Sequence, residues 1–143
     1  MARIVIVDDH PSTREGLSTR IELEPDLEVC GDADDVDEGL QLIAAKSPHL
    51  AIIDVSLKSG NGIELVKQVK ARGLPTRMLV WSMYDDSLYA ERALRAGAMG
   101  YINKTNLIER APKLAKIAWC CAMIFVVLVF SPDKSPRFIY FQF

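Results

Sequence analysis

Short apolar runs alternate with segments of helical periodicity along the first hundred residues, and this alternation constrains the fold more than any other feature of the sequence. The runs predict strands at residues 3–8, 27–31, 50–54, 78–82 and 100–102. The periodic segments predict helices at residues 12–24, 35–46, 62–72 and 86–96, with a fifth helix beginning near residue 106. Because parallel strands need crossover connections, five such alternations predict an α/β fold with a doubly wound five-stranded parallel sheet.

The helix predicted at residues 12–24 has a recognisable start. Ser12 and Glu15 have the spacing of a capping box, with Pro11 just outside the helix. Gly97 is expected to stop the helix at residues 86–96, because glycine commonly follows the last turn of a helix.

Two of the predicted strands end in acidic residues. The apolar run at residues 4–7 leads into Asp8 and Asp9, and the run at residues 50–53 leads into Asp54. An unpaired carboxylate taken out of water costs several kcal/mol. Since the carboxyl ends of parallel strands meet at one edge of a sheet, the three carboxylates are expected to form a cluster there that a cation holds together.

Two more chemically useful side chains are predicted at the same edge. Ser82 ends the fourth strand, and Lys104 follows the fifth. Mg²⁺ prefers oxygen ligands and typically joins one or two carboxylates to a phosphate. Asp54 would then be a nucleophile toward phosphorus, and the hydroxyl and ammonium groups would stabilise the phosphoryl oxygens. The edge therefore predicts phosphoryl chemistry with Mg²⁺ as the cofactor.

Composition and charge are consistent with an acidic globular domain. The chain has 143 residues, of which 50% are hydrophobic, and this is enough for one domain with a core. The net charge of −2 excludes a simple basic nucleic-acid binder. Residues 1–100 hold 11 Lys+Arg and 17 Asp+Glu, whereas residues 101–143 hold 6 and 2. The part with the carboxylates is thus the part suited to a metal or a cationic partner.

Cysteine usage favours a cytoplasmic location. Cys30, Cys120 and Cys121 fit neither a disulfide framework nor the spacing of a zinc site. The apolar run at the start of the sequence is too short for a signal peptide.

Taken together, the motifs resemble the receiver domain of two-component response regulators, with the spacing of the NarL/FixJ-like subgroup. The resemblance covers roughly residues 2–112. It implies a flavodoxin-like fold. The residues that carry it are Val5–His10, Ile53–Leu57, Gly60–Gly62, Ser82, Arg95–Tyr101 and Lys104.

The resemblance implies a phosphoacceptor and a Mg²⁺ site. Asp54 would accept a phosphoryl group from a phosphohistidine on a sensor histidine kinase, or from a small acyl phosphate. Asp9 would bind Mg²⁺ directly, Asp8 would bind it through water, and Asp54 and the backbone carbonyl of Ser56 would complete the protein ligands. The protein would then be a phosphoprotein switch of a phosphorelay and not a turnover enzyme.

The resemblance also implies how the switch would respond. Ser82 would hydrogen-bond the phosphoryl group, Lys104 would pair with it, and Tyr101 would rotate inward. Phosphorylation adds about −1.5 to −2 charge and would bias the face built from the fourth helix, fifth strand and fifth helix. A homodimer through that face is an expected partner.

Other chemistries fit the sequence less well. A haloacid-dehalogenase-like phosphatase needs a second acid two residues after the nucleophile, and neither acidic motif has one. A flavodoxin-like FMN binder needs a Ser/Thr/Gly-rich loop after the first strand, where this chain has two acids. His10 and His49 lack metal-ligand spacing, so ordinary structural or surface roles are predicted for them.

The predicted receiver domain spans residues 1–116, and residues 117–143 form an atypical apolar tail. NarL/FixJ-like regulators usually continue into a helix-turn-helix that reads DNA, and this tail does not resemble one, so no direct nucleic-acid binding is expected. The apolar run at residues 117–130 is shorter than the roughly 20 residues that span a bilayer. A turn-rich break and a second apolar patch at residues 138–141 follow it.

Three interpretations of the tail remain open. It extends the fifth helix and docks on its own domain or on a second copy, it lies at a membrane surface, or it is an out-of-frame or truncated end. The last is favoured, because a strongly apolar, β-branched stretch is an aggregation liability. The alternative function is a phosphorylation-independent interaction module whose tail binds a partner or a membrane. The intact acidic motifs argue against it.

Overall fold

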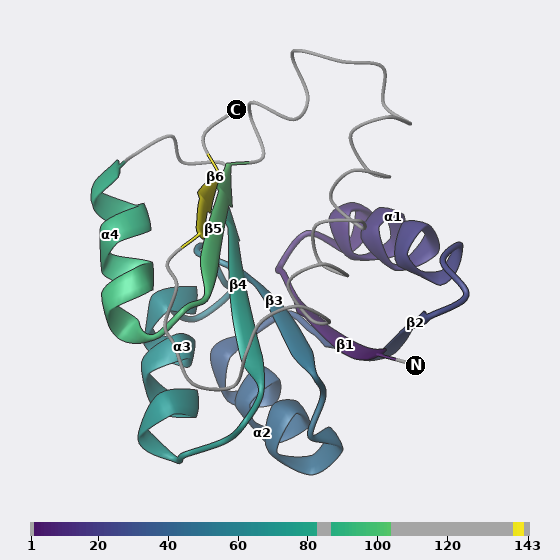
Figure 1. Ribbon diagram of the computed structural model, residues 1–143, viewed down its shortest axis with the longest axis horizontal. Helices are drawn as coiled ribbons and strands as arrows, with labels where there is room; N and C mark the ends of the chain where they lie inside the picture. Colours follow the sequence, from purple (N-terminus) through teal and green to yellow (C-terminus); the bar gives the residue numbers. More distant parts are fainter. Residues whose placement is uncertain (1, 83–86, 104–138, 142–143) are drawn as a thin grey trace.

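The computed structural model describes residues 2–82, 87–103 and 139–141, and its centre is one sheet of six parallel strands (Figure 1). The strands are β1 Ala2–Val7, β2 Leu27–Ala33, β3 Leu50–Asp54, β4 Arg77–Ser82, β5 Gly100–Asn103 and β6 Ile139–Phe141. The helices are α1 Pro11–Glu22, α2 Val36–Lys46, α3 Gly62–Ala71 and α4 Ser87–Ala96. The strand order is β2-β1-β3-β4-β5-β6. The predicted doubly wound sheet is confirmed, because the chain runs outward from β1 to β2 and then returns to β3 on the other side of β1.

The sheet has one strand more than the five predicted. β6 pairs parallel with β5, with Gly100 opposite Ile139 and Ile102 opposite Phe141. The sequence predicts only an apolar patch there, because so short a run shows no clear period. Within the described part of the chain, β5 therefore lies between β4 and β6 and not at the edge of the sheet.

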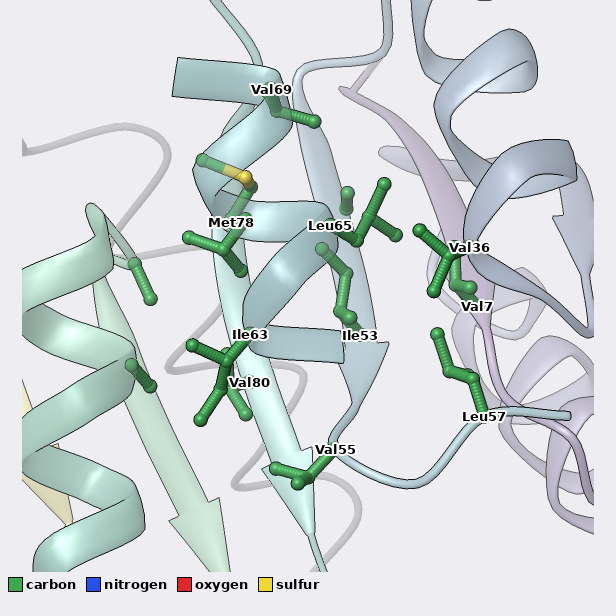
Figure 2. Packing of buried hydrophobic residues seen from close by; sticks show 14 of the residues in the cluster. Val7, Val36, Ile53, Val55, Leu57, Ile63, Leu65, Val69, Met78 and Val80 are labelled. Carbon is green, nitrogen blue, oxygen red and sulfur yellow. The ribbon is translucent and has the colours of Figure 1, made fainter. Parts of the chain in front are cut away.

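The two faces of the sheet carry separate apolar cores. In β1, Val5 and Val7 belong to the core shared with α2, α3 and α4, whereas Ile4 and Ile6 belong to the core that contains Ile21 of α1. Successive side chains of a strand point to opposite faces, so burial on both faces explains the continuous apolar runs of the sequence. Figure 2 shows the first core, in which strand and helix side chains meet, among them Val7, Ile53, Val80, Val36, Ile63 and Leu65.

The start of α1 corrects the predicted capping box. Pro11 is the first helical residue, and His10 is the N-cap, with an extended backbone and no side-chain cap. The carbonyl of His10 accepts hydrogen bonds from the N–H groups of Thr13 and Arg14, each at 3.1 Å. Proline suits this position because its φ is already helical and it has no N–H to leave unsatisfied. The helix therefore begins before Ser12, which is not its cap.

The other elements differ from their predicted bounds by one or two residues at an end, and β3 has the predicted bounds. Asp35 and Asn61 cap α2 and α3 by accepting hydrogen bonds from the N–H groups of Val36 and Ile63, each at 2.8 Å. Gly97 follows α4 with φ +119, a backbone conformation that favours glycine, as its predicted role requires.

Two predictions fall outside the residues that the structure describes. These are the fifth helix, expected from near residue 106, and the apolar run at residues 117–130. None of the described helices is both long and apolar enough to cross a membrane.

Candidate functional site

Three carboxylates meet at the carboxyl edge of the sheet, where β1 and β3 are neighbours. Asp8 and Asp9 directly follow β1, and Asp54 is the last residue of β3. Asp8 and Asp54 are buried, with exposed fractions of 3% and 4%. One donor atom from each of these acids and one from His10 lie within 4.8 Å of one another. The structure therefore brings together the three acids that the strand endings indicate.

Hydrogen bonds fix the turn that carries Asp8. Its N–H donates to the carbonyl of Ala33 in β2 at 3.0 Å, and its carbonyl accepts from Arg14 Nη1 at 2.7 Å. Its Oδ1 accepts from the N–H of His10 at 2.9 Å. Arg14 also pairs with Asp32, with Nε 2.8 Å from Oδ2. Contacts from β2 and α1 thus hold the first acidic motif in the cluster.

His10 is the residue of this site that the sequence does not reveal. Its Nδ1 lies 3.0 Å from Asp8 Oδ1, 2.8 Å from Asp9 Oδ1 and 3.7 Å from Asp54 Oδ2. The prediction of an ordinary structural or surface role does not anticipate these contacts. The available signal was its place directly after two acids and before the helix-starting Pro11. His49 has the predicted structural role, because its Nδ1 accepts a hydrogen bond from the N–H of Arg3 at 2.9 Å.

The carboxylate cluster fits a divalent cation. A neutral or protonated imidazole carries at most one proton on Nδ1, and that proton can be directed at one oxygen only. The Oδ1 atom of Asp9 is buried and accepts no hydrogen bond from the described residues. The single ring nitrogen of His10 therefore cannot serve all three carboxylates, and oxygen donors on neighbouring carboxylates are what Mg²⁺ binds.

The loop after β3 fixes the backbone of Asp54. A Cβ atom added to Gly62 would lie 1.9 Å from the carbonyl oxygen of Asp54, so only glycine fits at the first position of α3. The N–H of Gly62 donates to the carbonyl of Val55 at 2.8 Å, and Ser56 bridges to Asn61 across the loop. The start of α3 therefore packs directly against the end of β3.

A second acid stabilises the same loop. The Asp35 carboxylate accepts hydrogen bonds from the hydroxyl and the N–H of Ser59, at 2.6 and 3.1 Å, and from the N–H of Val36. The Ser59 hydroxyl bond, together with the N–H of Val36, lowers the pKa of Asp35 below its ordinary value. The tip of the loop is thereby tied to the start of α2.

Comparison with known proteins identifies the family. Residues 4–115 match the family described as the response regulator receiver domain. This chain belongs to that family. A Pseudomonas aeruginosa protein is 40% identical over 111 residues, which cover 76% of this chain and 53% of that protein. The transcriptional regulatory protein LiaR of Bacillus subtilis is 34% identical over 108 residues, covering 74% of this chain and 50% of LiaR.

The fold agrees with solved receiver domains. The signal receiver domain of NarL from Mycobacterium tuberculosis superposes with a TM-score of 0.73 and 30% identity, covering 85% of this chain and 94% of that domain. The chain spans about half the length of the curated relatives it matches. Receiver domains bind Mg²⁺ at an acidic pocket, and the cluster of Asp8, Asp9 and Asp54 is the acidic group of this receiver.

The two predicted switch residues lie on β4 and β5, the two strands that follow β3 across the sheet. β4 pairs with β3 so that Trp81 is opposite Asp54, which makes the fully buried Ser82 the next residue along β4. Tyr101 of β5 is opposite Val80. Its side chain is 2% exposed and lies in the core that also contains Val80, so the ring is already inside the protein.

Two other predicted site groups are not placed with the cluster. Lys104 lies outside the residues that the structure describes. Ser56 is half-buried in the loop after β3, and the role of its backbone carbonyl as a metal ligand stays a prediction.

Proposed function

We propose that this receiver domain accepts a phosphoryl group on Asp54 in a Mg²⁺-dependent reaction. The donor would be the phosphohistidine of a sensor histidine kinase or a small acyl phosphate. The observation that carries the proposal is the buried Asp54 carboxylate, with Asp8 and Asp9 grouped around it at the carboxyl edge of the sheet. Receiver domains of two-component systems are typically phosphorylated by such kinases.

The reaction would form one bond and break one. An Asp54 carboxylate oxygen attacks phosphorus, and the bond from phosphorus to the donor nitrogen or acyl oxygen breaks, leaving its electron pair on the donor. When bound, Mg²⁺ supplies positive charge that offsets the carboxylates and the phosphoryl oxygens. Asp8, Asp9, Asp54 and the Ser56 carbonyl would hold it.

Ser82 and Tyr101 would convert the new charge into a change of shape. The Ser82 hydroxyl would donate to a phosphoryl oxygen, and Lys104 would pair with another. Movement of Ser82 is expected to propagate along β4 to Tyr101 and the neighbouring α4, because β5 and α4 pack on the same core. A homodimer through this face is part of the proposal. In this chain β6 pairs with β5 on the side away from β4, so β6 would be part of that face.

The remaining assignments are also proposals. Residues 1–116 would form the receiver domain and residues 117–143 a separate tail. The protein would act in the cytoplasm as a switch and not as a turnover enzyme. Nothing in the described part of the chain supports the alternative of a phosphorylation-independent module.

Intact-mass spectrometry tests the phosphoacceptor. The purified chain is incubated with acetyl phosphate, with and without Mg²⁺. We expect one phosphoryl adduct that requires Mg²⁺ and that is absent from Asp54→Asn. Asp37→Asn, which changes an exposed acid in the first turn of α2, is the matched control and should retain the adduct. A folded wild-type protein without any adduct would overturn the proposal.

A further inference from the structure

We propose that the cleft between α3 and α4 binds an acidic peptide segment of a partner protein. This surface is separate from the carboxylate cluster. The proposal depends neither on a bound metal nor on Asp54 accepting a phosphoryl group.

The cleft lies between two neighbouring helices on one face of the sheet. α3 and α4 contact one another and pack on the same core (Figure 1). The cleft has a volume of about 570 Å³, and Ile63 and Ala96 contribute apolar groups to its lining. This volume is within the range of ligand-binding pockets.

The charged residues that line the cleft are mostly cations. Lys67 comes from α3, and Arg92 and Arg95 come from α4, one helical turn apart. Glu64 is the one acid among the described residues of the lining. Like charges one turn apart on a helix repel each other. An anionic occupant would relieve this repulsion, so the lining favours one.

A fourth cation extends the positive charge along the same side of α3. Lys70 lies one turn after Lys67, and its side chain runs across to the end of α4. A Cβ atom added to Gly97 would lie 2.4 Å from Lys70 Cγ and 2.6 Å from its Cε. Four of the 11 Lys and Arg residues within residues 1–100 therefore gather between these two helices, although this part of the chain holds 17 Asp and Glu.

The cations of the cleft have few strong partners within the chain. Among the residues that the structure describes, Lys67 and Arg92 form no ion pair. Arg95 Nη2 lies 2.5 Å from Glu91 Oε1, but these side chains are 78% and 54% exposed. Ion pairs exposed to water are weak. A carboxylate from a partner can therefore pair with these cations without breaking a strong internal contact.

Shape and charge favour a peptide over other anions. Small-molecule sites bury most of their ligand, whereas the cations of this cleft are exposed to water. A nucleic acid needs basic charge along an extended surface, and the rest of residues 1–100 is acidic. An acidic peptide segment can place carboxylates against Lys67 and Arg92 and an apolar side chain against Ile63.

Fluorescence anisotropy of the full chain with a labelled synthetic peptide of alternating glutamate and leucine tests the proposal. We expect Lys67→Glu and Arg92→Glu each to weaken peptide binding by at least about ten-fold, because each places like charges together. Lys46→Glu is the matched control, since it reverses an exposed lysine in the last turn of α2, outside the cleft. It should bind the peptide nearly as tightly as the wild type.

The three variants have the same net charge, so long-range electrostatics alone would affect them equally. Equal affinities of all three for the peptide would therefore overturn the proposal. So would a wild-type protein that shows no saturable binding.

Amide NMR of the wild-type protein locates the peptide even if a variant does not fold. Chemical-shift changes should concentrate on α3 and α4. Changes confined to other elements would overturn the proposal. Tighter binding of inorganic pyrophosphate or of a DNA duplex at the same cleft would also overturn it, because the preferred occupant would then be a different kind of anion.

Discussion

The two edges of the sheet differ in how their polar groups are satisfied. At the amino edge, where the strands begin, Arg3 donates two hydrogen bonds. Its N–H binds His49 Nδ1, and its Nη1 binds the carbonyl of Lys46. Nearby, the buried Thr76 hydroxyl donates to the carbonyl of Pro48 at 2.9 Å. At the carboxyl edge, by contrast, three carboxylates gather around the single ring nitrogen of His10. The amino edge pairs its polar groups by hydrogen bonds, whereas the carboxyl edge concentrates negative charge.

This contrast separates residues that maintain the fold from residues that maintain a function. Carboxylates held close together repel one another, which lowers the stability of the folded state. Destabilising arrangements of this kind are concentrated at functional sites. The carboxyl edge is therefore the place where ions and phosphoryl groups should change the free energy of unfolding. The amino edge should be indifferent to them.

The largest expected effect is steric and lies at the carboxyl edge. Gly62→Ala places a methyl group 1.9 Å from the carbonyl oxygen of Asp54, which requires β3 or α3 to shift. We expect a loss of about 3 kcal/mol or more in the free energy of unfolding, measured by urea denaturation. Gly16→Ala is the control, because a Cβ there meets nothing within 4 Å. It should stabilise α1 by about 0.5–1 kcal/mol. An equally mild effect of both substitutions would contradict the close packing at Asp54.

The second prediction concerns the cation. Mg²⁺ at one hundred times its dissociation constant should raise the free energy of unfolding by about 2.7 kcal/mol, because the folded state alone gathers the carboxylates. Asp9→Asn should abolish most of this gain, since it removes one of the three carboxylate charges of the cluster. Thermal unfolding with and without Mg²⁺ measures both. The same gain in the variant as in the wild type would show that the ion binds elsewhere.

The third prediction concerns a buried hydrogen bond at the amino edge. Thr76→Val removes a buried hydroxyl that donates to Pro48 and should cost about 1 kcal/mol. The loss should be the same with and without Mg²⁺. A loss that Mg²⁺ changes would mean that the two edges are energetically coupled.

The smallest effect concerns an acid whose partners come from the chain itself. Ser59→Ala removes the main cause of the lowered pKa of Asp35, so this pKa should rise toward its ordinary value of 3.8. A lowered pKa adds stability at pH values above the unfolded pKa, and this stability is lost as the pH falls through the folded pKa. The variant should therefore be less stable than the wild type at neutral pH, with the difference vanishing in acid. Carboxyl NMR titration and urea denaturation at both pH values measure this. An unchanged Asp35 pKa would assign the shift to the N–H of Val36.

Much of the fold and of the acidic cluster follows from short-range patterns. β3 could be predicted to the residue because Asp54 directly follows an apolar run of four residues, and all five residues of the strand are buried. Asp8, Asp9 and Asp54 could be grouped in advance, because neighbouring parallel strands necessarily end at one edge.

What could not be predicted depends on contacts without a sequence period. His10 enters the cluster because its own N–H binds Asp8 Oδ1, which curls the chain back on itself. Ligand-spacing rules describe regular elements and do not cover such a turn. β6 consists of three residues, and its pairing with β5 is a long-range choice that no local pattern encodes.

The central placement of β1 and β3 has a consequence for local opening. Each of these strands has a hydrogen-bonded neighbour on both sides, and Val5, Val7, Ala51 and Ile53 are fully buried. Exposing their amides to solvent requires the whole sheet to open, so their hydrogen exchange should be governed by global unfolding. Amides of the edge strand β2 need only part of the sheet to separate. The acids that would receive the signal are thus attached to the slowest-exchanging part of the domain.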